Sequence, residues 1–198
     1  MNKLTRRTTL AGMISAIALA ASPAFTLNTA QARGLIDEVV AKINSVINSG
    51  KSEAAMYRDF EALFNRYADV PTISRSALGP PARSASNQQL SQFSDAFAGY
   101  LARKYGKQFR DFIGGEITVE DARQVKSFQE VQAVAKLRGQ SPFAVTFMVS
   151  DRSGSNLFFD LLIEGISLLK SERAEIGAML DKNGGNIDAL IRDLKSAG

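Results

Sequence analysis

The chain has 198 residues, with no cysteine, no histidine and a formal net charge of +4. Without cysteine it has no disulfide, no thiol chemistry and no lipidated cysteine anchor, and without histidine it lacks the commonest general base and metal ligand. We therefore expect no metal, no cofactor and no catalytic residues, so that an enzyme working with carboxylates, lysine, tyrosine or serine is the less favoured alternative.

Residues 1–32 have the features of a cleavable secretory signal peptide. A basic start and a short apolar stretch precede small residues at Ala30 and Ala32. The apolar stretch is shorter than the roughly 20 residues that span a membrane. We predict cleavage after Ala32, which removes three basic residues and no acidic one and lowers the net charge from +4 to +1. The pair Arg6 and Arg7 leaves Sec and twin-arginine export both open.

Residues 33–198 are expected to form one α+β domain. A segment of this size supports one hydrophobic core and is too short to suggest two full domains. Its nearly balanced charge lacks the clustered basic face that nucleic acid requires, so no nucleic-acid partner is expected.

Hydrophobic spacing in the first half predicts helices. A wide apolar stripe runs through residues 35–47, and a second follows in residues 56–67. A short helical turn over residues 72–79 ends before a pair of prolines. Ser86 and Gln89 form a capping box for a long aromatic-rich helix that is expected to run to the glycines at 114 and 115.

The hydrophobic period changes after this helix. Alternating patterns predict strands, and the turn at Gly154 joins two of them into a hairpin. The chain then returns to helix after Gly165, and Asn186 is the predicted cap of the last helix. This order predicts an α+β fold in which an antiparallel sheet of about four strands packs with helices. The predicted strands are residues 117–125, 130–139, 143–149 and 157–163.

The last predicted strand, LFFDLLI (residues 157–163), has large apolar side chains on both faces. Either helices cover both faces, or one face lines an apolar cavity. Its Phe-rich surroundings, without tryptophan, favour a pocket for an apolar ligand. Asp160 and Glu164 offer an acid/base pair, but we expect both to meet basic partners or solvent near the strand ends.

Four basic residues cluster on the polar side of the long helix. A solvated helix face explains them, and the sharper hypothesis is a surface that docks an acidic partner or anionic head groups. The predicted partner-docking residues are Arg103, Lys104, Lys107 and Arg110.

An ordered set of segments resembles one known family. FEALFNRYADVPTISRSALG, FSDAFAGYLARKY and FDLLIEGISLLKSERAEI, followed by GGNIDALIRDL, are similar to the MlaC family, also called toluene-tolerance proteins. The resemblance covers almost all of residues 33–198. One departure is the sequence Pro80-Pro81-Ala82-Arg83, where the family usually has a bulky aromatic residue and an arginine.

The resemblance implies a periplasmic phospholipid carrier. It implies a twisted antiparallel sheet and helices that enclose an apolar cavity for acyl chains, with the head group exposed. It also implies two partners, an outer-membrane lipoprotein and porin complex and an inner-membrane ABC transporter, and a role in outer-membrane lipid asymmetry. We expect a monomer. The direction of transport, the head-group preference and the number of acyl chains stay open.

We assign lipid binding to twelve apolar and aromatic side chains of the predicted helices and strands. They are Phe64, Tyr67, Leu78, Phe93, Phe97, Tyr100, Leu101, Val145, Phe147, Val149, Phe158 and Leu162. A secreted adaptor or structural protein with an ordinary core is the main alternative, and a small-molecule enzyme is a further one.

Overall fold

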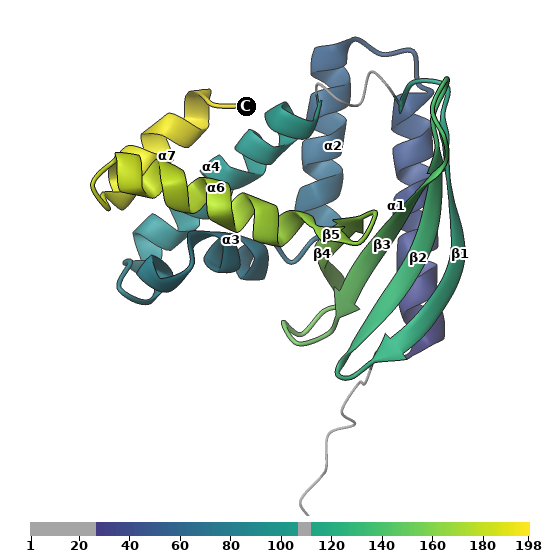
Figure 1. Cartoon of the computed structure of the whole chain (residues 1–198), viewed down its shortest axis with the longest axis horizontal. Coiled ribbons are helices and arrows are strands. Elements are labelled where there is room, and N and C mark those ends of the chain that lie inside the picture. Colours follow the sequence, from purple (N-terminus) through teal and green to yellow (C-terminus); the bar gives the residue numbers. More distant parts are fainter. Residues whose placement is uncertain (1–26, 107–111) are drawn as a thin grey trace, which may run out of the picture.

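The computed structural model describes residues 27–106 and 112–198 and consists of an open sheet with helices (Figure 1). The helices are α1 (Thr29–Ile47), α2 (Glu53–Tyr67), α3 (Val70–Leu78), the 3-10 helix η1 (Pro80–Arg83), α4 (Asn87–Gly106), α6 (Leu168–Lys182) and α7 (Ile187–Ser196). The strands are β1 (Glu116–Val125), β2 (Phe128–Lys136), β3 (Phe143–Ser150), β4 (Leu157–Ile163) and β5 (Ile166–Ser167). The predicted α+β class is confirmed.

The sheet is antiparallel and its strands lie in sequence order, β1-β2-β3-β4-β5. The short strand β5 is an addition to the predicted sheet of about four strands. A two-residue turn produces it, because Glu164 and Gly165 have φ angles of 49° and 78°, in the left-handed region. At this turn the chain reverses before it enters helix, and Ile166 pairs with Ile163.

Helix α1 packs on one face of the sheet and also protects its edge. Its apolar stripe, which includes Ile36 and Val40, packs in one core cluster with the buried side chains of β2 and β3. At the edge, the Asn44 side chain donates to the Ile117 carbonyl and accepts from the Ile117 N–H, at 2.8 and 3.0 Å. These bonds pair backbone groups of the edge strand β1 that would otherwise be open to another chain.

The other helices form a second core, beside the sheet in Figure 1. Phe93, Phe97, Ile176, Leu190 and Leu194 are fully buried in it and come from α4, α6 and α7. The capping predictions are confirmed, since Ser86 and Gln89 exchange two hydrogen bonds of 3.1 Å and Asn186 caps α7. A third, smaller cluster joins α1 and α2 around Ile47, Met56 and Phe60.

Two predicted segments lie wholly or partly outside the described residues. Helix α4 ends at Gly106 in the described part of the chain, and the predicted continuation through residues 107–111 lies outside it. Most of the predicted signal peptide, residues 1–26, also lies outside the described residues. Among the helices of the described ranges, none is long and apolar enough to cross a membrane.

Candidate functional site: an apolar cavity between sheet and helices

A cavity of about 240 Å³ lies where the three core clusters meet. The first cluster contributes Ile73 and Phe97, the second Val39, Val145 and Phe147, and the third Phe60. Side chains of β4 and the first turn of α6 complete the wall, so sheet and helices enclose it together. A cavity with a wall of this kind is typical of sites that bind apolar ligands.

A β-bulge determines which residues of β4 face the cavity. Met148 pairs with Asp160 and Val149 pairs with Phe158, so Phe159 has no partner of its own in β3. Beyond the bulge, Leu161 pairs with the cavity-lining Phe147. The bulge therefore lets Phe158 and Leu161 face the cavity together, although strict alternation would place them on opposite faces.

Six of the twelve predicted lipid-binding residues line the cavity and six do not. The lining residues are Phe64, Phe97, Leu101, Val145, Phe147 and Phe158. The six that the structure places elsewhere are Tyr67, Leu78, Phe93, Tyr100, Val149 and Leu162. Of these, Leu162 pairs with Thr146 on the other face of the sheet, because the bulge moved the apolar face of β4 to Leu161 and Ile163.

The other displaced residues belong to the packed core. Leu78 and Phe93 are buried in the helical cluster, and Val149 is buried in the cluster beneath α1. Tyr67 and Tyr100 are buried with their hydroxyls directed to acids, and the Tyr100 hydroxyl donates to Glu175 at 2.6 Å. These residues were assigned because they lie on apolar faces of helices or strands. The hydrophobic period does not distinguish a side chain that packs in the core from one that lines a cavity.

Several lining residues were missed by the sequence assignment. Val39 and Ile43 of α1, Phe60 and Leu63 of α2, and Leu169 of α6 lie on stripes that the spacing identified only as buried or left unassigned. The apolar stripe of one helix or strand does not show whether the element that packs opposite fills the space next to it or leaves a cavity. The exception is LFFDLLI, whose two apolar faces predicted a cavity. The assigned residue Leu162 does not line that cavity, whereas its neighbour Leu161 does.

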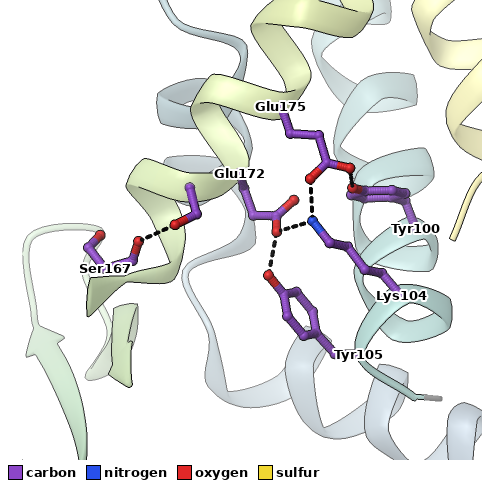
Figure 2. Close-up of polar contacts among 7 residues, drawn as sticks. Tyr100, Lys104, Tyr105, Ser167, Glu172 and Glu175 are labelled. Atoms are coloured by element: carbon purple, nitrogen blue, oxygen red, sulfur yellow. Dashed lines mark hydrogen bonds and ion pairs between the residues drawn. The ribbon is translucent and has the colours of Figure 1, made fainter. Parts of the chain in front are cut away.

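The polar residues of the wall belong to α4, β4 and α6. Glu172 is 2% exposed, and its Oε1 accepts from the ammonium of Lys104 at 2.7 Å and from the hydroxyl of Tyr105 (Figure 2). Lys104 also contacts Glu175, which accepts from Tyr100. Tyr100, Lys104, Tyr105, Glu172 and Glu175 are called the α4–α6 network below. It links the two helices on one side of the cavity.

Burial and pairing set the protonation of this network. Burial alone lowers the pKa of Lys104, but its hydrogen bonds to Glu172 and Glu175 raise that pKa well above the ordinary value of lysine. Burial, followed by the bond to Glu175, raises the pKa of Tyr100, and burial with the bond to Glu172 does the same for Tyr105. At neutral pH the lysine is therefore charged and both phenols are neutral donors.

The predicted docking residues have internal roles where the structure describes them. Lys104 belongs to the α4–α6 network, and Arg103 donates to the carbonyls of Leu194 and Ala197 at the end of α7, at 2.5 and 2.8 Å. A basic side chain at that position favours a helix C-terminus. Lys107 and Arg110 lie outside the described residues. The internal contacts of Arg103 and Lys104 leave both side chains less available to a docked partner.

Asp160 and Glu164 have separate structural roles, and both accept hydrogen bonds from hydroxyl or backbone N–H groups where the sequence predicted basic partners or solvent. Asp160 accepts from the Ser167 hydroxyl at 2.5 Å and from the N–H groups of Leu161 and Leu169, at 2.8 and 3.0 Å. It thereby fastens the first turn of α6 to β4. The Glu164 carboxylate instead accepts from the N–H of Ala144. In the part of the chain that the structure describes, no group of three or more acidic side chains could hold a metal ion.

The comparisons with known proteins agree with this architecture. The family profile described as MlaC protein matches residues 34–196. The chain belongs to the MlaC family. The structure of this MlaC-family protein is also similar to the solved structure of a phospholipid-binding protein from Ralstonia solanacearum in complex with a phospholipid. The two chains are 18% identical, and the TM-score is 0.71. The match covers 83% of this chain and 95% of the other, and at this identity it shows the fold. No curated protein matches the MlaC-family chain.

Proposed function

We propose that this MlaC-family protein is a binding protein rather than an enzyme, and that it holds phospholipid acyl chains in the cavity. The observation that carries the proposal is the wall itself, since its described residues are apolar apart from Asp160, Glu172 and the hydroxyl of Tyr105. The phospholipid in complex with the structurally similar protein from Ralstonia solanacearum supports the same ligand class.

The energetics of lipid transfer fit such a wall. Removing a C16 chain from water is worth on the order of 11 kcal/mol at about 0.8 kcal/mol per CH₂, so a free phospholipid is not a viable intermediate in an aqueous compartment. A carrier needs only to match the apolar environment of the bilayer. A cavity of Phe, Leu, Ile and Val does so with few directional bonds, which permits both uptake and release.

Membership of the MlaC family supports a proposal for the wider role. We propose a periplasmic shuttle between an outer-membrane lipoprotein and porin complex and an inner-membrane ABC transporter, which maintains outer-membrane lipid asymmetry. Loss of the protein from its own cells is then expected to increase phospholipid at the cell surface, measured by labelling amine head groups with a reagent that does not cross the membrane. Unchanged labelling would argue against this role while leaving lipid binding intact.

Lipid binding itself is tested on the exported protein purified without detergent. Native mass spectrometry is expected to show a mass excess of one or two glycerophospholipids, and extraction of the same sample is expected to recover them. A protein that arrives bare and takes up no phospholipid from vesicles would contradict the proposal. Its cavity would then be a packing defect of an ordinary core, as in the adaptor alternative.

For export, we propose that the signal peptide is cleaved upstream of Leu27 and not after Ala32. The support is structural: helix α1 begins at Thr29, and Ala32 is fully buried inside it. The side-chain amide N–H of buried Gln129 donates to the Leu27 carbonyl at 3.1 Å, and its amide oxygen accepts from the Thr29 hydroxyl at 3.0 Å. Asn28 completes a capping box with Gln31.

Cleavage after Ala32 would remove these partners and leave a buried amide unpaired. Small residues at Ser22 and Ala24 offer a site upstream. The intact mass of the exported protein is therefore expected to place its N-terminus before Leu27. A chain that begins at Arg33 is expected to lose about 3 kcal/mol of unfolding free energy relative to one that begins at Phe25, from the lost cap and the unpaired amide. An exported chain beginning at Arg33 with equal stability would contradict this.

A further inference from the structure

Glu172 lines the cavity, and one of its two carboxylate oxygens has no partner among the described residues. Oε2 of Glu172 is buried and accepts no hydrogen bond, although Oε1 of the same carboxylate accepts two. A buried carboxylate oxygen without a donor costs folding free energy, because it has lost water and gained nothing in its place. A ligand that brings a donor to this atom would recover that cost.

The other polar groups of the wall are already satisfied. Asp160 accepts from three donors, and the Tyr105 hydroxyl gives its hydrogen to Glu172. The unpaired group beside the cavity is thus an acceptor, and its partner must be an N–H or O–H group. The α4–α6 network holds one lysine against two carboxylates, so its charge is negative overall and favours a cationic donor.

The α4–α6 network also connects the cavity with solvent. The side chain of Glu172 is 3% exposed, whereas those of Lys104 and Glu175 are 26% and 47% exposed. A lipid whose tails fill the cavity and whose polar end reaches water would pass such a boundary. Figure 2 shows the side chains of the α4–α6 network at this boundary.

We propose that Glu172 Oε2 accepts a hydrogen bond from the head group of the bound lipid, and that the protein therefore prefers a primary ammonium head group to a trimethylammonium one. This inference rests on the proposed phospholipid binding and adds head-group selection to it. The two head groups carry the same charge, but only the primary ammonium has N–H donors. A hydroxyl head group, as in phosphatidylglycerol, has the donor without the positive charge and is expected to rank between them.

The test is a competition for uptake. The delipidated protein is incubated with vesicles of phosphatidylethanolamine, phosphatidylglycerol and phosphatidylcholine with identical acyl chains, and the bound lipid is identified by mass spectrometry. The wild-type protein is expected to enrich phosphatidylethanolamine over phosphatidylcholine about ten-fold relative to the vesicles, the size of effect that a charge-assisted hydrogen bond produces. Glu172→Gln is expected to bring this ratio close to that of the vesicles.

Asp181→Asn removes the same charge from an exposed position of the same helix and is expected to keep the ten-fold enrichment. Equal uptake of the two lipids by wild type would overturn the inference, since water then serves Oε2 as well as a head group does. Enrichment that persists in folded Glu172→Gln would also overturn it. The wild-type arm decides the matter if that variant does not fold. Absence of any bound lipid would instead refute the proposed function.

Discussion

Phe147→Asp is expected to lower the phospholipid recovered with the purified protein to less than a tenth of the wild-type amount. Phe147 lines the cavity, is 3% exposed and packs edge-to-face on Phe158 with ring centroids 5.8 Å apart. A carboxylate at this position must stay hydrated, and the water that it retains occupies space needed by an acyl chain. Lipid extraction with native mass spectrometry measures the loss.

Two further variants separate loss of binding from loss of folding. Thr146→Asp introduces the same charge one residue away on the other face of β3, and it is expected to keep the wild-type lipid content. Ile163→Asp places the charge at a half-buried position of the cavity wall, where its cost to folding is smaller, and it is expected to reduce lipid as Phe147→Asp does. Equal lipid in wild type and folded Ile163→Asp would show that acyl chains do not occupy this cavity.

Lys104→Met is expected to destabilise the fold by about 3 kcal/mol. The change leaves Glu172 buried without its cation, and removal of one partner of a buried ion pair typically costs about 3–5 kcal/mol. The partial exposure of Lys104 favours the lower end of this range. Urea denaturation followed by circular dichroism measures the change in unfolding free energy.

The double variant Lys104→Met with Glu172→Gln is expected to recover at least half of this loss, because it removes the unpaired charge and keeps an acceptor for the Tyr105 hydroxyl. Lys170→Met, at an exposed position of α6, serves as the matched control and is expected to change stability by less than about 0.5 kcal/mol. A loss below about 1 kcal/mol for Lys104→Met would mean that the network behaves as a solvated surface pair.

The class of this protein and much of its local structure were predictable from local sequence patterns. Apolar stripes with a helical period located α1, α2 and α4, and alternation located the four long strands. Capping signals at Ser86 and Asn186 were sufficient because a cap depends on residues three positions apart. The family was recognisable from ordered segments, and the match to residues 34–196 confirms it.

The apolar residues that surround the cavity depend on how the elements pack against one another. Five of the twelve assigned residues, Phe93 among them, lie in the packed core, because a stripe shows that a side chain is buried but not whether its neighbour fills the space. The bulge at Phe159 arises from pairing with β3 and moved the cavity face from Leu162 to Leu161. Likewise, Glu172 of α6 is buried against Lys104 and Tyr105 of α4, which lie nearly 70 positions earlier in the chain. No local sequence pattern encodes that contact.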